Sequence, residues 1–302
     1  MTKKIIVLAG GTGNLGQQIV KTLLQLNAEV RLIVRPTSNL KTIEYLANLG
    51  AKIFTINMQS QSQIAQVCQG ASCFVSAVAG LQNVIIDAQT LFVKAAIEAN
   101  VPRFIPSDYC LDFTPFAHGT NRNLDTRRIF ATYLNAAPIK ATSIFNGAFA
   151  NMLTNQIPMI IFKKKWVLYW GNKNHKMPFT TIANTAAYTA YASLDDTAPR
   201  YLRIAGSAIS ASEIRSTLNQ LTGQHYKLIK TGSQTMLGVI IKTARLLSPG
   251  TTQLYPAWQG MQYMHNMVDP KCLVNNLHNN RYSNITFTTV AQLLDNYIKT
   301  QP

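Results

Sequence analysis

Residues 4–16 read KIIVLAGGTGNLG, an apolar run that ends in a glycine-rich loop. The run from Ile5 to Ala9 is short and apolar throughout, which predicts a strand buried on both faces of a sheet. Gly10 to Gly16 follow it directly, and residues 17–26 then carry apolar side chains at helical spacing. A strand, a glycine-rich turn and a helix in this order form the context that a dinucleotide-binding loop requires.

The same alternation of apolar runs and helical patterns continues through the first half of the chain. Further strands are expected over residues 30–34, 52–56, 71–78, 103–106 and 141–145. Helices are expected between them, over residues 42–49, 62–68, 84–99 and 124–135. Strands that alternate with helices at this spacing form right-handed βαβ units and a parallel sheet. The predicted fold class is therefore α/β, a doubly wound parallel sheet of the Rossmann type.

The pattern changes after Asn146. Two short hairpin-like strands are expected over 165–169 and 178–181, and two further strands over 201–205 and 226–230. Helices are expected over residues 184–194, 211–222 and 234–247. We interpret residues 1–150 as a Rossmann domain that binds NAD(P). Residues 151–302 are then a smaller C-terminal α+β domain that caps the carboxyl edge of the sheet and need not be continuous in sequence.

The glycines of the loop have separate expected roles. Gly10 permits a tight turn, Gly13 lets backbone N–H groups approach a pyrophosphate, and Gly16 lets the helix pack closely on the strand. The phosphates would then lie at the positive N-terminus of the helix. The alternative is an ordinary tight turn without a ligand. We predict that the loop binds the cofactor through Gly10, Thr12, Gly13, Asn14, Leu15 and Gly16.

The end of the second strand indicates which dinucleotide is bound. An NAD-specific site places an acidic residue there, whereas here Val34 is followed by Arg35 and no acid occurs before Glu44. A guanidinium suits a 2′-phosphate, so we predict NADP(H), bound through Arg35, Ser38 and Lys41. Cofactor contacts are also expected where later strands end, at Ala77, Val78 and Asn146. For Asn146, which precedes a glycine, a structural turn is the alternative.

Composition excludes several other classes of protein. With 47% hydrophobic residues among 302, the chain can bury a large core, which excludes a disordered protein. The four cysteines have no CxxC spacing, so neither a disulfide scaffold nor a zinc site is expected. The sequence has no HExxH, GxSxG or GxxxxGK[ST] motif, which argues against metallohydrolases, serine hydrolases and P-loop ATPases. We expect no bound metal.

The net charge of +16 is unusual for a chain of this length, with 28 Lys and Arg against 12 Asp and Glu. Such an excess attracts a phosphorylated cofactor, nucleic acid or an acidic membrane surface. The basic residues are dispersed, however, so a nucleic-acid partner is not expected, and a surface poor in acids is the plain alternative. No apolar run approaches the ~20 residues needed to cross a bilayer. We therefore predict no membrane partner and a cytoplasmic location.

Five segments resemble one family of proteins. GGTGNLG at 10–16, VRP at 34–36, RFIPSDYCLDF at 103–113, GNKNHKMPFTT at 171–181 and LRIAGSAIS at 202–210 are similar to the NmrA-like and isoflavone-reductase-like branch of the atypical short-chain dehydrogenases. The resemblance implies an NADP-dependent reductase of aromatic or quinone-like molecules, or a non-catalytic, cofactor-sensing regulator.

Two departures from these patterns bear on catalysis. The Tyr-xxx-Lys motif of short-chain dehydrogenases is absent after the fifth strand. The resembled reductases place a lysine on the helix before the sixth strand, where this chain has Thr126, Arg127 and Arg128. Arginine does not donate a proton near neutral pH, but it can stabilise an oxyanion. We therefore predict Arg127 as an electrostatic catalytic residue.

Other candidate site residues follow from their position near the carboxyl edge of the sheet. Tyr109 is the predicted proton donor, with a packed core tyrosine as the alternative. Asp108 or Asp112 is expected to pair with Arg127 or Arg128, and the loop 113–123 is expected to act as a lid. A wall for a flat substrate, or else ordinary core or a dimer contact, is expected from Tyr255, Trp258, Met261, Tyr263, Met264 and Met267.

Two functions therefore remain open. The first is an NADPH-dependent reductase that acts on an aromatic, enone or quinone-type small molecule, with Tyr109 or a water as proton donor. The second is an NADP(H)-sensing regulator without turnover that acts through a protein partner; a homodimer is compatible with either. An epimerase of nucleotide sugars shares the fold but would need Tyr-xxx-Lys.

Overall fold

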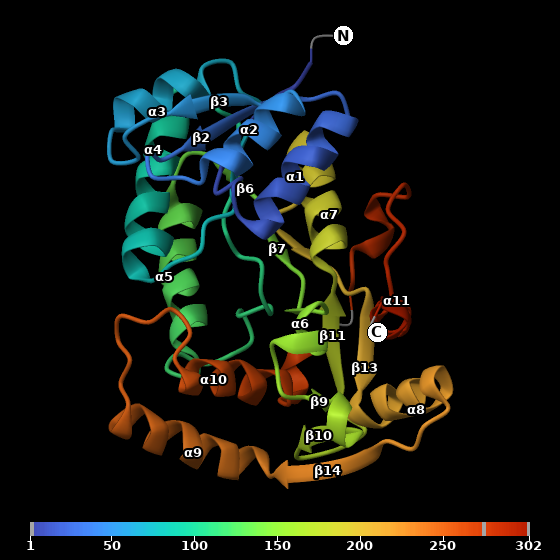
Figure 1. The fold of residues 1–302 in the computed structure, drawn as a ribbon. Helices are drawn as coiled ribbons and strands as arrows, with labels where there is room; N and C mark the ends of the chain where they lie inside the picture. Colours follow the sequence, from blue (N-terminus) through green and yellow to red (C-terminus); the bar gives the residue numbers. More distant parts are fainter. Residues whose placement is uncertain (1–2, 274–275, 301–302) are drawn as a thin grey trace.

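A computed structural model describes residues 3–273 and 276–300 of the chain (Figure 1). Its centre is a six-stranded parallel sheet in the order β3-β2-β1-β4-β5-β6. The strands are β1 (Ile5–Ala9), β2 (Glu29–Val34), β3 (Lys52–Thr55), β4 (Cys73–Ser76), β5 (Arg103–Ile105) and β6 (Lys140–Ala141). This strand order is that of a doubly wound dinucleotide-binding sheet. The predicted α/β fold class is confirmed.

Helices cover both faces of this sheet. They are α1 (Asn14–Gln25), α2 (Leu40–Asn48), α3 (Gln61–Cys68), α4 (Gln89–Glu98) and α5 (Arg122–Ala136). One apolar core lies between the sheet and α1, and the other between the sheet and α3, α4 and α5. The helix expected over 84–99 begins with a π-helical segment, η1 (Asn83–Ala88), which continues into α4.

The strand expected over 141–145 is interrupted, so this prediction was wrong in part. Thr142 still donates its N–H to the carbonyl of Phe104, but the N–H of Ser143 is bonded to the carbonyl of Arg200 at 2.8 Å. The chain therefore leaves the central sheet at this point. The next strand, β7 (Ser143–Phe145), pairs in parallel with β12 (Tyr201–Arg203).

The second half contains two small sheets and further helices. One sheet has the order β14-β10-β9 and the other the order β13-β11-β8. Their strands are β8 (Ala148–Phe149), β9 (Ile160–Ile161), β10 (Trp166–Trp170), β11 (Lys176–Thr180), β13 (Ser207–Ser210) and β14 (Lys227–Gly232). The segments predicted as hairpin-like strands, β10 and β11, therefore lie in different sheets. The helices are α6 (Met152–Asn155), α8 (Ala211–Thr222), α9 (Gln234–Leu247), α10 (Ala257–Met267) and α11 (Val290–Thr300).

One helix from the second half belongs to the packing of the first half. Helix α7 (Ile182–Leu194) lies against α1, and its side chains Ala186, Tyr188 and Ala190 are fully buried in the core on that face of the sheet. A domain division at residue 150 stays a prediction. Such a division has to assign α7 to the N-terminal domain, as a discontinuous part of it. Within the described residues, no helix is long and apolar enough to span a bilayer.

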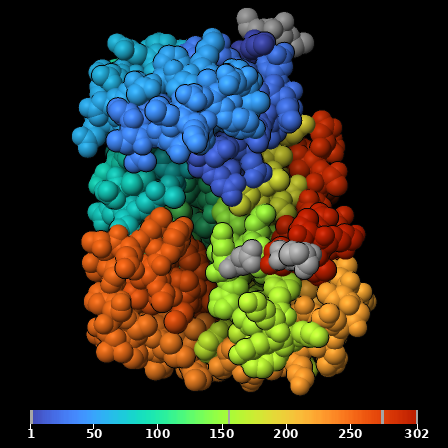
Figure 2. Space-filling model, viewed as in Figure 1, coloured from blue at the N-terminus to red at the C-terminus, as the bar shows by residue number. Residues whose placement is uncertain are grey.

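The two halves are visible on the surface of the molecule (Figure 2). The blue and cyan residues of the N-terminal half lie at one end and the orange residues of α9 and α10 at the other. Between them the face is hollowed, and the green segment is recessed at this level. In a sheet of this kind, ligands bind outside the carboxyl ends of the strands.

Candidate functional site

The glycine-rich loop has the close packing that its sequence predicts. Gly10 has φ +81°, a conformation that residues with a side chain rarely adopt. A Cβ atom on Gly10 would lie 2.4 Å from the carbonyl oxygen of Ala77, and one on Gly16 would lie 2.2 Å from that of Gly10. Both positions therefore require glycine, and the loop is held tightly against the end of β4.

Gly13 is different, because the space beside it is open. It is the N-cap of α1, and the nearest atom to a Cβ placed on it is the carbonyl oxygen of Gly10 at 3.4 Å. No side chain caps this helix, and the backbone N–H groups of residues 14–16 have no hydrogen-bond partner within the described part of the chain. An uncapped helix N-terminus with open approach fits a phosphate group.

Arg35 follows β2 next to this loop. Its backbone N–H donates to Oγ of Ser38 at 3.2 Å, and the N–H of Ser38 donates back to the Arg35 carbonyl at 3.0 Å. The side chains of Arg35 and Lys41 are exposed, and neither forms an ion pair with a described residue. Ser38 thus shapes the turn, while Arg35 and Lys41 provide the unpaired positive charge that a 2′-phosphate requires.

A continuous set of contacts leads from this loop to Arg127. The Ser107 hydroxyl, just after β5, donates to the carbonyl of Val78, just after β4, at 2.6 Å. Arg127 on α5 donates from Nε to the carbonyl of Ser107 at 3.0 Å and from Nη1 to that of Asn123 at 3.0 Å. The hydrogen bonds of the Arg127 guanidinium to described residues use Nε and Nη1, which leaves Nη2 available. Together with the Gly10–Ala77 contact, these bonds place the loop, the ends of β4 and β5, and Arg127 along one edge of the sheet.

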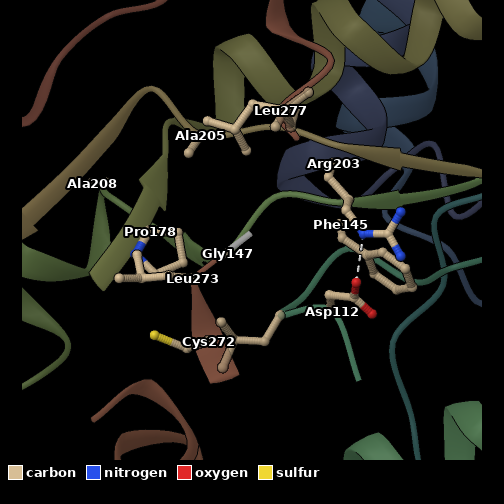
Figure 3. A pocket seen from close by; sticks show the side chains of 12 residues that line it. Asp112, Phe145, Gly147, Pro178, Arg203, Ala205, Ala208, Cys272, Leu273 and Leu277 are labelled. Atoms are coloured by element: carbon tan, nitrogen blue, oxygen red, sulfur yellow. Dashed lines mark hydrogen bonds and ion pairs between the residues drawn. The ribbon is translucent and has the colours of Figure 1, made fainter. Parts of the chain in front are cut away.

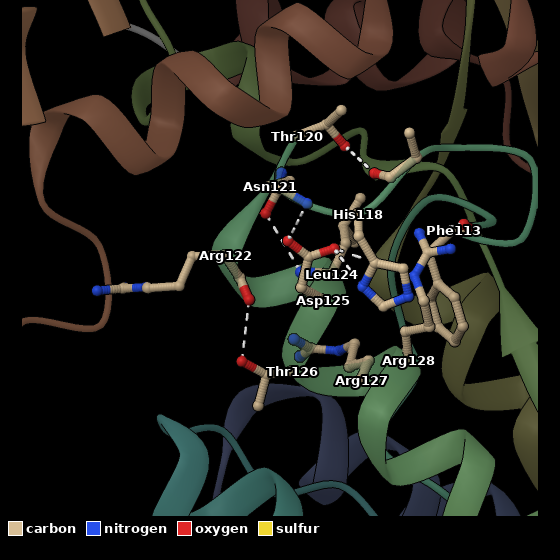
Figure 4. Close-up of polar contacts among 12 residues, drawn as sticks. Phe113, His118, Thr120, Asn121, Arg122, Leu124, Asp125, Thr126, Arg127 and Arg128 are labelled. Atoms are coloured by element: carbon tan, nitrogen blue, oxygen red, sulfur yellow. Dashed lines mark hydrogen bonds and ion pairs between the residues drawn. The ribbon is translucent and has the colours of Figure 1, made fainter. Parts of the chain in front are cut away.

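Arg127 stays charged in this position. Burial lowers its pKa, but the nearby Tyr263, Cys110 and Asp108 together raise the pKa above its ordinary value. Arg128, the next residue, leaves α5 in a different direction (Figure 4) and donates from Nη2 to the Phe113 carbonyl at 2.7 Å. A fixed guanidinium with one free nitrogen can bind a developing oxyanion.

Tyr109 does not have the environment of a proton donor near neutral pH. It is buried in the core with Ile105 and Ile144, and its hydroxyl lies near the side chain of Thr189 on α7. Burial raises its pKa further above the ordinary value. The geometry therefore favours the alternative of a packed core tyrosine over the predicted proton donor.

Neither Asp108 nor Asp112 forms the expected ion pair with Arg127 or Arg128 within the described residues. Asp112 pairs with Arg203, with 2.6 Å between Oδ2 and Nε. Asp108 is fully buried; burial raises its pKa, while a hydrogen bond from Ser143 at 2.7 Å opposes this rise. The Asp112–Arg203 pair lies beside a small pocket (Figure 3). None of the predicted cofactor residues lines this pocket.

The end of the loop 113–123, which was expected to act as a lid, is anchored at the start of α5. Asn121 is fully buried at the N-cap of α5 and exchanges side-chain hydrogen bonds with Asn266 at 3.1 Å and Gln259 at 2.8 Å. The guanidinium of Arg122 donates to the carbonyls of Gln253 and Leu254. Figure 4 shows Asn121 and Arg122 at the start of α5, and the side-chain hydrogen bonds of Asn121 connect this end of the loop to α10.

Most of the expected aromatic and methionine wall faces elsewhere. Trp258 is buried; its indole N–H donates to the carbonyls of Ser248 and Pro249 at 3.1 Å, and the guanidinium groups of Arg122 and Arg245 both lie over its ring. Met267 belongs to the core beneath α10, Met264 lines a separate small pocket, and no contact places Met261 near Arg127. Only Tyr263 and Tyr255 interact electrostatically with Arg127. Helical spacing alone could not predict which side chains of α10 face Arg127, because Met267 packs into the core and Met264 lines a different pocket.

Asn146 has an unusual environment. It is fully buried, its backbone N–H donates to the Cys110 carbonyl at 3.1 Å, and neither carboxamide atom has a partner within the described residues. A buried polar group without a partner is costly and often marks a missing ligand or water. The next residue, Gly147, has φ +67°, as a turn requires. The role of Asn146 as a cofactor contact stays a prediction.

Comparisons with known proteins identify the family of the chain. The model of the NmrA-like family matches residues 1–246. The chain is 27% identical over 255 residues to the bifunctional pinoresinol-lariciresinol reductase 1 of Thuja plicata, covering 78% of this chain and 80% of that protein. It is 22% identical over 325 residues to the corresponding reductase of Forsythia intermedia, covering 99% and 100%.

Solved structures share the fold. A structure from a study of pinoresinol-lariciresinol and phenylcoumaran benzylic ether reductases superposes with a TM-score of 0.85 at 22% identity, covering 98% of this chain and 100% of the other. An NADPH-dependent quinone oxidoreductase from Escherichia coli superposes with a TM-score of 0.75 at 17% identity, covering 97% and 99%.

Proposed function

This chain belongs to the NmrA-like family, and we propose that it is an NADPH-dependent reductase of an aromatic, enone or quinone-type small molecule. The observation that carries the proposal is the position of Arg127. Its charged guanidinium has a free nitrogen and is joined through Ser107 and Val78 to the same sheet edge as the glycine-rich loop. The relatives are named as reductases of the aromatic molecule pinoresinol, and a structural neighbour is named as a quinone oxidoreductase.

The residues present fit a bound NADPH. The open space at Gly13 and the unpaired N–H groups of α1 would hold the pyrophosphate, and Arg35 with Lys41 would hold the 2′-phosphate. The unpaired carboxamide of Asn146 would meet a polar group of the cofactor. When bound, the cofactor supplies the hydride.

Arg127 would stabilise the negative charge that develops on the substrate oxygen, because its guanidinium is already fixed by two carbonyls. Tyr255 and Tyr263 would lie beside a flat substrate there. Burial raises the pKa of Tyr263, so a water is the proposed source of the proton.

A regulator that binds NADP(H) without turnover is the second candidate. The observation that favours it is that burial raises the pKa of both Tyr109 and Tyr263, so neither of these two described residues is suited to donate a proton near neutral pH. Such a regulator would act through a protein partner. For either function we propose a cytoplasmic location, because Cys68, Cys73, Cys110 and Cys272 are all unpaired and buried, as in a reducing compartment.

The test follows NADPH absorbance with a panel of quinones and aromatic enones. We expect Arg127→Ala to lower kcat by about 100-fold or more while NADPH affinity changes little. Arg35→Ala is the matched control, because it should weaken NADPH binding and leave NADH binding unchanged. Tight NADPH binding by the wild-type protein without turnover on any acceptor would favour the regulator. Tighter binding of NADH than of NADPH would contradict the predicted cofactor.

A further inference from the structure

Helix α9 exposes an apolar face to solvent. Of its fourteen residues only Leu237 and Ile241 are buried. Large apolar side chains on the other side are exposed: Met236 by 52%, Val239 by 59%, and Leu246 and Leu247 by 82% each. Residues spaced three, four and seven apart lie on one side of a helix, so these four and Thr243 form one stripe, here termed the α9 face.

The position of α9 leaves this face open. The helix lies at the lower edge of the molecule in Figure 1, and its contacts are with α10. Exposed leucines at the end of a helix are unfavourable in water unless they contact something. None of the residues of the proposed reductase site lies on α9.

The chain segment that contains α9 carries charge of a single sign. No aspartate or glutamate occurs in residues 214–268, which include β14, α9 and α10. The exposed cations of this part are Lys227, Lys230, Lys242 and Arg245, and none of them forms an ion pair with a described residue. Lys242 and Arg245 lie on α9 itself, beside the apolar stripe.

We propose that the α9 face docks on an anionic lipid surface. Leu246, Leu247 and Val239 would enter the boundary between head groups and acyl chains, while Lys230 and Lys242 contact the anionic head groups. An amphipathic helix with an apolar stripe flanked by cations binds such a surface through burial of its apolar side chains and through electrostatic attraction to the anionic head groups. This proposal concerns peripheral contact and is compatible with the lack of a membrane-spanning helix among the described residues.

Two other occupants fit less well. A second copy of the chain would bring two cationic surfaces together, because residues 214–268 contain no acid to pair with them. Nucleic acid would pair its phosphates with the cations, but it would also place phosphates against the exposed leucines, whose apolar surface would not be buried by that contact.

The test is co-sedimentation of the full-length protein with vesicles. We expect the protein to bind phosphatidylcholine vesicles that contain about 30 mol % phosphatidylserine, and to bind pure phosphatidylcholine much less. Raising the salt concentration from about 0.1 M to about 0.5 M should weaken the binding. Failure to bind the anionic vesicles at the lower salt concentration would overturn the proposal.

Variants separate the apolar contribution from the electrostatic one. Leu246→Gln with Leu247→Gln should lower the partition coefficient about ten-fold or more, whereas Leu40→Gln with Ile129→Gln, which alters exposed apolar residues on α2 and α5, should not. Lys230→Glu with Lys242→Glu should lower it more than about 25-fold, since each cation near the surface contributes about five-fold. Lys94→Glu with Lys140→Glu changes the net charge equally and should have a much smaller effect.

Three outcomes would contradict the α9 face as a lipid contact. The first is vesicle binding that is unchanged by the two leucine substitutions. The second is a concentration-dependent dimer that these substitutions abolish, without vesicle binding. The third is tight binding to duplex DNA that the leucine substitutions leave intact and that vesicles do not displace. A thermal unfolding curve for each variant verifies that the fold is retained.

Discussion

Replacing Gly13 with alanine should separate cofactor binding from folding. Gly13 has φ −75°, which alanine adopts without strain, and a Cβ there meets one atom within 4 Å, at 3.4 Å. The methyl group would project into the open space where we place the pyrophosphate. It would therefore obstruct the phosphate while leaving the loop intact.

The magnitudes follow from this geometry. Glycine to alanine at an unstrained position gains about 0.4–1 kcal/mol through the unfolded state, and alanine loses a similar amount as a poorer N-cap. The free energy of unfolding should thus change by less than about 1 kcal/mol. Losing one or two charge-assisted hydrogen bonds of about 1.5–3 kcal/mol each should weaken NADPH binding at least about ten-fold.

Gly16→Ala is the matched control. Its Cβ would lie 2.2 Å from the Gly10 carbonyl oxygen and 2.6 Å from the Cα atom of Gly11, so the backbone has to move. We expect a loss of about 1–3 kcal/mol in the free energy of unfolding. Nicotinamide fluorescence titration gives the affinity, and urea unfolding gives the stability. If Gly13→Ala binds NADPH like the wild-type protein, or unfolds as easily as Gly16→Ala, the assigned position of the phosphates is incorrect.

Three further predictions concern residues whose environment differed from the sequence-based expectation or lies outside the site. Asp112→Asn should lower the free energy of unfolding by about 3 kcal/mol in urea unfolding, because it leaves the half-buried Arg203 without its carboxylate; Asp295→Asn, which removes an exposed pair, should cost less than about 1 kcal/mol. Trp258→Ala should lower stability by about 3–5 kcal/mol, since the indole is buried and bonded to two carbonyls; unchanged stability with lost substrate binding would restore its role in a substrate wall. The third concerns Asp195, where burial raises the pKa but hydrogen bonds from Thr197, Tyr282 and Arg281 outweigh it and lower the pKa to about 2. This group therefore stabilises the fold above its unfolded pKa of about 3.9 and loses that effect as the pH falls toward 2, so Asp195→Asn should flatten the acid side of the pH–stability curve.

The local sequence was sufficient to predict those strands and helices whose structure depends on residues close to them in the chain. Parallel strands covered on both faces need apolar residues throughout, so Ile5–Ala9 could be predicted directly. Helices α8 and α9 begin and end where expected, because Ser210 and Ser233 cap their N-termini with side-chain hydrogen bonds.

The predictions that failed depend on partners distant in sequence. The sixth strand breaks because Ser143 bonds to Arg200, and no local pattern signals a partner 57 residues away. The loop before α5 is fixed by Asn266, which comes from α10 at the other end of the chain. For the site, the loop glycines were predictable from their spacing. The burial of Tyr109 was not, because it depends on the packing of α7 against the central sheet.

The packing of α7 on α1 has a consequence for how this protein can be divided. Helix α1 begins at the glycine-rich loop, and its side is covered by residues 186–190 of a helix that the chain reaches only after leaving the nucleotide-binding half. A chimera that takes residues 1–150 alone would inherit the loop but leave the apolar side of α1 in water. A chimera that keeps the loop folded must therefore include α7 as well as α1. The two helices form one structural unit, although some 150 residues separate them in sequence.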